Sequence, residues 1–381
     1  MTEPSAKRPM RPRERFLAAL AGKPVDRPSA ASPTAIVSES LMDLVRAPFP
    51  QAHRDPQLMT RLAETASTHV GFDTIMPVFS IVQESAALGC EVDWGDKTNW
   101  PTCKGALVQS AEEIRIPGDV LDKPETRCVV ESIAELKRRW GDEVAVVGKA
   151  MGPWTLGYHV FGTQPFLLMT VDDPGAVKRS LHALKELTVR FGIAQVEAGA
   201  DALTVPDHAT GDLVRAEYYR DFLQELHTEL CERIPCPLIL HICGATEDRM
   251  PYIRETGFAA FHLDSKNDVR RSLGIMRGKC RLVGNINNPQ TLLWGTPDSV
   301  RQAVRDVLDA GLTLVGPECA LPLHCPLENL KAIPLAIEEW AAQRAAASPR
   351  HGRHHTPVPL GPELPGTRRP SPHDIGGFAD P

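Results

Sequence analysis

Residues 202–242 have the sequence ALTVPDHATGDLVRAEYYRDFLQELHTELCERIPCPLILHI, and this pattern sets the architecture of the chain. It begins with a short apolar run, Ala202–Val205, continues through a segment of helical period, Arg215–Arg233, and ends in a second apolar run, Pro237–Ile242. Short aliphatic runs bounded by Gly, Pro, Asp or Asn are typical of buried parallel strands. Two such runs joined by a helix predict a βαβ unit.

The same alternation extends from this unit in both directions. Further predicted strands are Arg27–Ser32, Asp73–Phe79, Val144–Lys149, Ala259–Leu263, Arg281–Ile286 and Leu312–Val315. Further predicted helices are Pro174–Gly199, Asp248–Gly257 and Pro297–Gly311, the last with Thr296 as its N-cap. Eight such units close into a barrel, whereas an open doubly wound sheet has about five or six strands. We therefore predict an α/β protein with a (β/α)8 TIM barrel.

The predicted barrel domain covers residues 1–346, with an insertion between the second and third strands. This insertion, about residues 80–141, is expected to extend over the mouth of the barrel. Residues 347–381 are rich in Pro, Gly, Arg and His and lack an apolar period, so we predict a disordered tail. No GxGxxG follows a predicted strand, which disfavours a dinucleotide-binding fold.

The composition indicates which partners and which cellular compartment to expect. The 381 residues carry a net charge of -6 with both signs mixed, which argues against nucleic acid as a partner. No run of about 18 apolar residues is present, so no membrane span is expected. Nine cysteines without a signal sequence indicate reduced thiols in the cytoplasm, some of them free to act as ligands or nucleophiles.

Polar and metal-competent residues gather where the predicted strands end. Barrel enzymes carry their chemistry at this face, because the carboxyl ends of all eight strands open onto one mouth. The residues that follow the strands are Glu84, Asp207, His208, His241, Cys243, His262, Asp264, Asn285, Asn287, Asn288, Glu318 and Cys319. The strand bodies stay aliphatic, so this distribution points to a functional mouth.

His241, Cys243 and Cys319 form the candidate catalytic and metal-binding set. Side chains at positions i and i+2 of a strand point to one face, so His241 and Cys243 are expected to enter the lumen together. Cys319 ends the eighth predicted strand at the same mouth. Two thiolates and one imidazole suit Zn²⁺, and three protein ligands leave one position for water or substrate. The alternative is that the three residues are ordinary packing residues of a core.

Other cysteines are weaker candidates. Cys325 lies six positions after Cys319 and is a rival ligand, but it is expected to begin the last helix. Cys231 and Cys236 flank Pro235 at a helix-to-strand turn on the opposite face of the barrel. We interpret that pair as structural.

Several stretches resemble the uroporphyrinogen decarboxylase superfamily, and within it most resemble the zinc-dependent methylcobamide:coenzyme M methyltransferases. The most specific are LILHICG (238–244), GNINNPQTLLWGTPDSV (284–300) and GPECALPLHCPLENLKA (316–332), and the others are VFSIVQESAALGCEVDWG (78–95), GKAMGPWTLGYHVFG (148–162) and DALTVPDHATGDLVRAEYYRDF (201–222). The resemblance runs from about residue 13 to residue 345.

The resemblance implies a barrel and a zinc ion bound by His241, Cys243 and Cys319. It further implies transfer of a methyl group from a methylcobamide, carried by a corrinoid protein or free as methylcobalamin, to a small thiol such as coenzyme M. A free thiol with a pKa near about 8.5 is mostly protonated at pH 7, and coordination to zinc deprotonates it.

Four further residues receive roles as hypotheses. Glu84 is a candidate spare zinc ligand in the absence of substrate, or the partner of a cation elsewhere. Asp207 or Asp264 is a candidate hydrogen-bond partner for the imidazole of His241, with solvation or a helix cap as the alternative. Asn285, like Asn287, is expected to hold either loop backbone or ligand.

The sequence also departs from the metal-free decarboxylases of the superfamily. Its first-strand region, DRPSAASPTAIVSES (26–40), lacks the arginine-rich run that would pair the carboxylates of a tetrapyrrole. Tetrapyrrole decarboxylation is the alternative activity, and a non-catalytic scaffold that binds a corrinoid protein is a third interpretation. The sequence leaves open the methyl acceptor (coenzyme M, another thiol or a folate), the original methyl donor, the fourth zinc ligand and the oligomeric state.

Overall fold

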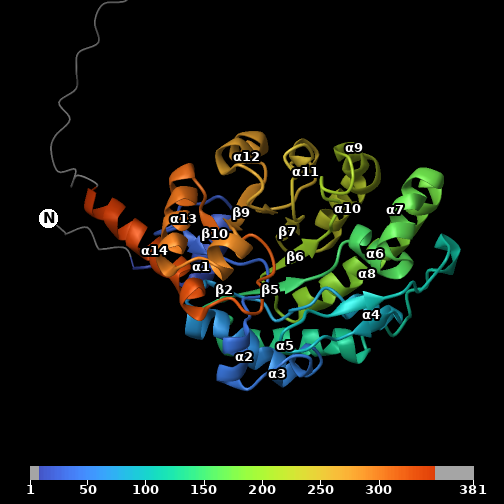
Figure 1. Ribbon diagram of the computed structural model, residues 1–381, viewed down its shortest axis with the longest axis horizontal. Helices are drawn as coiled ribbons and strands as arrows, with labels where there is room; N and C mark the ends of the chain where they lie inside the picture. Colours follow the sequence, from blue (N-terminus) through green and yellow to red (C-terminus); the bar gives the residue numbers. More distant parts are fainter. Residues whose placement is uncertain (1–7, 348–381) are drawn as a thin grey trace, which may run out of the picture.

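The computed structural model describes residues 8–347, and eight parallel strands lie at the centre of the molecule with the helices arranged around them (Figure 1). The strands are β1 (Ser29–Ala30), β2 (Thr74–Ile75), β5 (Ala145–Lys149), β6 (Ala202–Pro206), β7 (Leu238–His241), β8 (Ala260–Leu263), β9 (Arg281–Ile286) and β10 (Leu314–Pro317). Their hydrogen-bonded order is β1-β10-β9-β8-β7-β6-β5-β2, which places neighbouring units side by side. The predicted (β/α)8 barrel is confirmed.

Helices lie at all four predicted positions, where α8 and α13 match the predicted bounds closely and α11 is shorter than predicted, and further helices complete the barrel. In chain order, the helices are α1 (Pro12–Leu20), α2 (Glu39–Val45), α3 (Pro56–Ala63), α4 (Gln83–Leu88), α5 (Pro124–Trp140), α6 (Pro153–Phe161), α7 (Thr163–Asp172), α8 (Pro174–Glu197), α9 (Ala216–Tyr218), α10 (Gln224–Arg233), α11 (Met250–Ile253), α12 (Val269–Met276), α13 (Pro297–Ala310) and α14 (Leu327–Ala347). The predicted cap of α13 is confirmed, because the Thr296 side chain accepts a hydrogen bond from the Ser299 amide. The single helix predicted over Arg215–Arg233 is instead interrupted by a π-helical turn at Tyr219–Leu223.

The seam between β1 and β2 is joined largely by side chains. Both strands are two residues long, shorter than predicted, and no ladder pairs them directly. The buried carboxylate of Asp73 accepts hydrogen bonds from the Ala30 amide (3.0 Å) and from the guanidinium groups of Arg15 (2.9 Å) and Arg27 (3.2 Å). The Ser32 amide donates to the Thr74 hydroxyl at 3.0 Å. Charged and polar side chains therefore replace most of the missing backbone ladder at this seam.

Successive side chains of a strand point alternately into the barrel and toward the helices, and this alternation decides which residues reach the lumen. In β5, Gly148 faces outward, since a Cβ at that position would meet Gln195 of α8 and Leu203 of β6. The next residue, Lys149, therefore points inward at the carboxyl end of the strand. The same alternation carries His241 and Cys243 to one side, with Ile242 fully buried between them.

Part of the segment predicted as an insertion forms a hairpin whose residues Trp100 and Thr102 line the cavity at the mouth. A two-stranded hairpin, β3 (Glu91–Asp93) and β4 (Thr102–Lys104), lies between α4 and α5 in the chain. The Trp100 indole of this hairpin donates a hydrogen bond to the Leu321 carbonyl at 3.2 Å, which ties the hairpin to the loop after β10. The segment 80–141 also contains α5, which is the helix of the barrel itself that connects β2 to β5.

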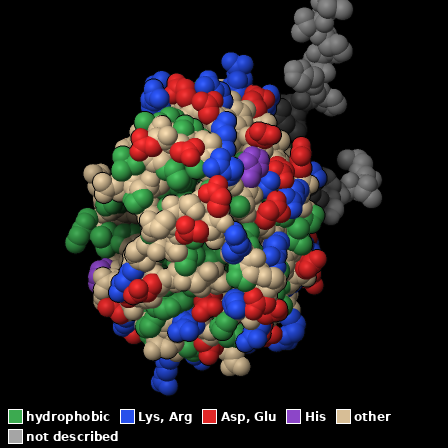
Figure 2. Space-filling view, turned by 90° about the vertical axis from the view of Figure 1, so that its right-hand side faces the viewer, with side chains coloured by type: hydrophobic (Ala, Val, Ile, Leu, Met, Phe, Trp, Pro, Cys, Tyr) green, Lys and Arg blue, Asp and Glu red, His purple; other side chains and the backbone are tan. Residues whose placement is uncertain are grey.

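The last described helix, α14, ends at Ala347, so residue 347 is helical and the rest of the predicted disordered tail lies outside the described residues. Within residues 8–347, no helix combines the length and the apolar character needed to cross a bilayer. Figure 2 shows acidic and basic side chains interspersed over one face of the molecule.

Candidate metal centre

Two thiols and an imidazole converge at the carboxyl ends of β7 and β10. The His241 Nε2 lies 3.1 Å from the Cys243 Sγ and 3.4 Å from the Cys319 Sγ. The two sulfur atoms are 2.9 Å apart, although 76 positions separate the residues in the chain. All three side chains predicted as ligands are therefore brought together.

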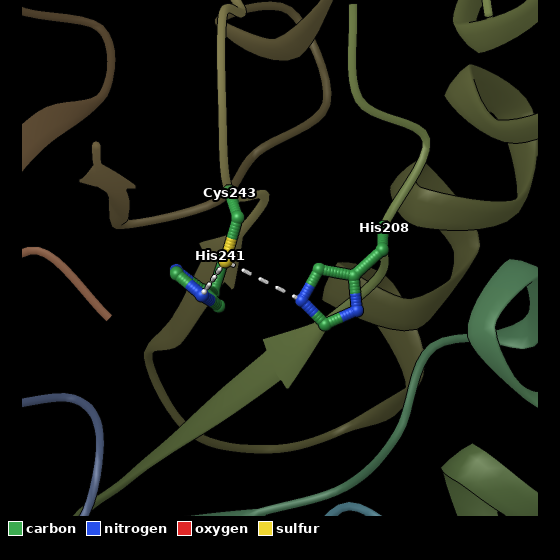
Figure 3. Close-up of side chains that lie close together, drawn as sticks. All are labelled: His208, His241 and Cys243. Carbon is green, nitrogen blue, oxygen red and sulfur yellow. Dashed lines mark hydrogen bonds between the residues drawn. The ribbon is translucent and has the colours of Figure 1, made fainter. Parts of the chain in front are cut away.

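A second imidazole, that of His208, lies beside this group. His208 follows β6, and its Nε2 lies 3.7 Å from the Cys243 Sγ (Figure 3). The ligand atoms of His208, His241 and Cys243 all lie within 4.8 Å of one another. The sequence placed His208 at a strand end but did not mark it as a ligand. Its position two residues after Pro206, on the lumen side of the strand, was the signal.

Burial sets the protonation of this cluster. It lowers the pKa of His241 well below its ordinary value, aided by the neighbouring His262 and His208 imidazoles. Burial likewise lowers the pKa of His208 to about 4, so both rings are neutral near pH 7 and free to donate a lone pair. The hydrogen bond between the two thiols lowers the pKa of Cys319, while that bond and then burial raise the pKa of Cys243.

The donor set matches the chemistry of zinc. Neutral imidazole and thiolate are the ligands that Zn²⁺ prefers, with bonds of about 2.0 Å to nitrogen and 2.3 Å to sulfur. In a tetrahedral site, two sulfur ligands lie about 3.8 Å apart. Since the sulfur atoms of Cys243 and Cys319 are 2.9 Å apart, they would have to separate by about 1 Å, a shift within reach of side-chain rotation.

The loop after Cys243 is held by a carboxylate. Asp264 accepts a hydrogen bond from the Gly244 amide at 2.7 Å and from the Lys266 amide at 2.9 Å. Gly244 has φ +84°, and a Cβ there would approach the side chains of Asp212 and Thr210 within 2.5 Å. Glycine therefore permits the sharp turn that directs Cys243 back toward His241.

The hypothesis that Asp207 or Asp264 holds the His241 imidazole is wrong. Asp207 accepts hydrogen bonds from the Thr155 amide (2.8 Å) and faces the His227 Nε2 (2.9 Å), and Asp264 binds loop amides. The His241 Nδ1 has no hydrogen-bond partner among the described residues. For Asp207 the physical reason is the alternation of side chains along the strand, because Pro206 and His208 line the cavity and the residue between them points away. The carboxylate of Asp264 is instead occupied by the Gly244 and Lys266 amides.

Glu84 and Asn285 contact backbone groups. The Glu84 carboxylate accepts a hydrogen bond from the Met151 amide at 2.6 Å, and burial raises its pKa. Lys149 lies close enough to oppose that shift electrostatically. The Asn285 amide donates to the Asn267 carbonyl at 3.3 Å, and the Asn287 amide donates to the Ser265 hydroxyl at 2.9 Å.

The remaining candidate cysteines lie elsewhere. The rival ligand Cys325 is buried, and its thiol donates to the Leu292 carbonyl at 3.1 Å. Burial raises the pKa of Cys231 and of Cys236 to about 12, as expected for unreactive thiols.

A cavity of about 330 Å³ opens onto the cluster. His208, His241 and Cys319 form part of its wall, together with Lys149 from β5 and Trp100 from the hairpin. Most of the other lining residues are apolar. The cavity thus connects the predicted ligands with a space large enough for a small substrate.

A parallel (β/α)8 barrel with thiols and imidazoles gathered over the carboxyl ends of its strands has the organisation of a barrel enzyme. The chain belongs to the uroporphyrinogen decarboxylase family, whose sequence model matches residues 11–340.

Its relatives include methyltransferases that match over nearly their whole length. The chain is 30% identical over 331 residues to a methylcobamide:CoM methyltransferase of Methanosarcina barkeri, covering 86% of this chain and 98% of that protein. It is 30% identical over 336 residues to a methylated-thiol–coenzyme M methyltransferase of Methanosarcina mazei, covering 88% and 91%. A uroporphyrinogen decarboxylase of Novosphingobium aromaticivorans is 29% identical over 226 residues, covering 56% and 66%.

The solved structures agree with this grouping. A methyltransferase from Methanosarcina mazei is similar with a TM-score of 0.85 and 29% identity, covering 87% of this chain and 99% of that one.

Proposed function

We propose that this protein transfers a methyl group from a methylated corrinoid to a small thiol, with zinc held by His241, Cys243 and Cys319. The observation that supports this most directly is the approach of these three ligand atoms, within 2.9–3.4 Å of one another, beside a cavity whose wall includes His241 and Cys319. Zinc bound there would supply the Lewis acidity that keeps a substrate thiol in its thiolate form. The names of the relatives point to the same chemistry.

The reaction asks the chain mainly to position two reactants. A substrate thiolate attacks the methyl carbon, the C–S bond forms as the Co–C bond breaks, and the bonding electrons leave with cobalt as Co(I). No group of the protein needs to form a covalent bond or to transfer a proton during this step. The apolar cavity wall excludes water from the thiolate, which strengthens its interactions and its nucleophilicity.

His208 is the side chain best placed to complete the coordination. It lies on the cavity side of Cys243, at 3.7 Å, and its neutral ring offers one free nitrogen lone pair. We infer that His208 is the fourth ligand when no thiol is bound and yields this position to the substrate. Its Nδ1 lies 3.3 Å from the Thr155 hydroxyl, which fixes the direction of the ring.

The cavity disfavours tetrapyrrole decarboxylation. A tetrapyrrole with several carboxylates needs several cationic partners. Of the described residues that line the cavity, Lys149 is the one Lys or Arg. A scaffold without catalysis would not need two neutral imidazoles and two thiols gathered beside a substrate-sized cavity.

The test is methyl transfer from methylcobalamin to coenzyme M by the zinc-loaded protein. We expect the methyl–cobalt absorption to fall as methylated thiol accumulates. The His241→Ala variant should lower the rate by roughly 100-fold or more, because it removes a ligand. His182→Ala, which changes an exposed histidine of α8, is the matched control and should keep the wild-type rate. Equal activity of the His241→Ala variant and the wild type would exclude the assigned zinc site.

A further inference from the structure

Two cysteines lie on one face of the hairpin formed by β3 and β4. Val92 of β3 pairs with Cys103 of β4, and both side chains are half-buried while their neighbours in the strands are exposed. Cys90 lies two residues before Val92, so the alternation of side chains places it on the same face as Cys103. The next residue along β4, Thr102, lines the cavity, so Cys103 points away from the cavity and from the metal centre.

The two thiols meet each other and an imidazole between the hairpin and the helices α4 and α6. The hydrogen bond between the thiols raises the pKa of Cys90 and lowers that of Cys103. Burial opposes the shift at Cys103, and a hydrogen bond with the His159 imidazole of α6 supports it. The His159 Nδ1 lies 2.6 Å from the Ser85 hydroxyl of α4, and the His159 carbonyl oxygen lies 3.8 Å from the Cys90 sulfur. Cys103 therefore has the thiolate character of the pair, and Cys90 is its protonated neighbour.

Cys103 differs from the other thiols outside the metal centre. Burial raises the pKa of Cys280 and, to about 12, the pKa of Cys128, Cys231, Cys236 and Cys325. Among the cysteines within residues 8–347, Cys103 is the one outside the metal centre whose pKa is lowered. Its side chain is half-buried, so a small oxidant can reach the sulfur. Thiolate character and exposure are the two properties that make a cysteine susceptible to oxidation.

We propose that Cys103 and Cys90 form a reversible oxidation site, at which a small peroxide converts the two thiols into a disulfide. The Cys103 thiolate attacks one peroxide oxygen, the S–O bond forms as the O–O bond breaks, and the departing hydroxide takes up a proton to give water. The Cys90 thiol then attacks the sulfenic acid. The S–S bond forms as the S–O bond breaks, and the Cys90 proton leaves with the hydroxyl group as a second water. The pair loses two electrons and the peroxide gains them.

The position of the pair gives this bond a structural consequence. The two thiols are already hydrogen-bonded, so a small movement of the side chains closes the disulfide. The bond would cross-link the two strands near the base of the hairpin. The turn between these strands carries Trp100, whose indole is tied to the loop after β10. Oxidation would therefore restrict the segment that reaches the mouth of the barrel.

The test treats the zinc-loaded protein with hydrogen peroxide and maps its thiols by mass spectrometry without a reducing agent. Trypsin cleaves after Arg61, Lys97 and Lys104, so Cys90 and Cys103 fall in separate peptides, 62–97 and 98–104, with no other cysteine in either. We expect the two peptides to be linked after oxidation and to be released by dithiothreitol. The link should form at least about tenfold faster than the oxidation of the thiols whose pKa is raised to about 12.

Variants of the pair separate the roles of the two sulfur atoms. In the Cys90→Ser protein, Cys103 should stop at the sulfenic acid, which dimedone traps, and in the Cys103→Ser protein Cys90 should stay reduced. Cys236→Ser, at another half-buried cysteine, is the control and should still form the link. Peptides 62–97 and 98–104 that stay unlinked in the oxidised wild-type protein would overturn the proposal. So would dimedone labelling of Cys236 as readily as of Cys103 in the Cys90→Ser protein.

Discussion

The Cys319→Ser variant is expected to purify with less than about one tenth of the zinc of the wild-type protein and to lose methyl transfer by at least about 100-fold. Serine preserves the size and polarity of the side chain. Its hydroxyl, however, does not deprotonate readily near pH 7 and is a poor zinc ligand compared with thiolate. The remaining ligands, His241 and Cys243 with the nearby His208, include only one thiolate and should hold zinc much more weakly. Elemental analysis and the methylcobalamin assay measure the two effects.

Cys325→Ser is the matched control for this experiment. Cys325 is buried, lies six residues further along the chain, and donates its thiol to the Leu292 carbonyl outside the cavity. Both variants replace cysteine with serine, so any general effect of losing a buried thiol should appear in both. We expect the Cys325→Ser protein to keep about one zinc per chain. Zinc loss in the Cys325 variant, with zinc retained in the Cys319 variant, would reverse the assignment.

The central strands could be predicted because each is buried on both faces. Strands β5 to β9 consist mostly of aliphatic residues, and their observed limits lie within one residue of the predicted ones. The prediction was less accurate at β1 and β2, whose predicted limits included residues that pair through side chains. Asp73, assigned to the second predicted strand, acts there as a carboxylate acceptor. An apolar pattern cannot distinguish a strand from an extended segment held by an ion pair.

The candidate ligands could be predicted from the alternation of side chains along a strand and from the positions of the strand ends. His241 and Cys243 share a face because they are two residues apart, and Cys319 follows β10 by two residues at the same mouth. The same alternation argues against Asp207 as a partner of His241. Its neighbour His208 points into the cavity, so Asp207 must point away. The sequence could not reveal the convergence of Lys149 and Ser80 on that cavity. That convergence depends on the closure of the barrel, which brings distant strands together.

The Asp73→Ala variant is expected to lose about 3–5 kcal/mol of unfolding free energy, which is a large share of the stability of an ordinary domain. Removing the carboxylate leaves the guanidinium of Arg15 buried without one of its two acidic partners, and it removes the acceptor of the Ala30 amide. The side chain of Asp73 is only 1% exposed, so water cannot readily replace it. Denaturant titration measures the loss, and Asp298→Ala, at a 94% exposed side chain, is the control.

The Asp73→Ala variant also tests whether stability and metal binding depend on opposite ends of the barrel. Asp73 precedes β2 and lies at the amino-terminal end of the seam, whereas His241 and Cys319 lie at the carboxyl ends of their strands. Stability should therefore fall while the folded fraction still binds about one zinc per chain. A variant that keeps full stability would show that the seam does not depend on this carboxylate. Loss of zinc from the folded variant would instead show that the seam positions the metal ligands. The buried ion pair of Asp73 would then affect both stability and metal binding.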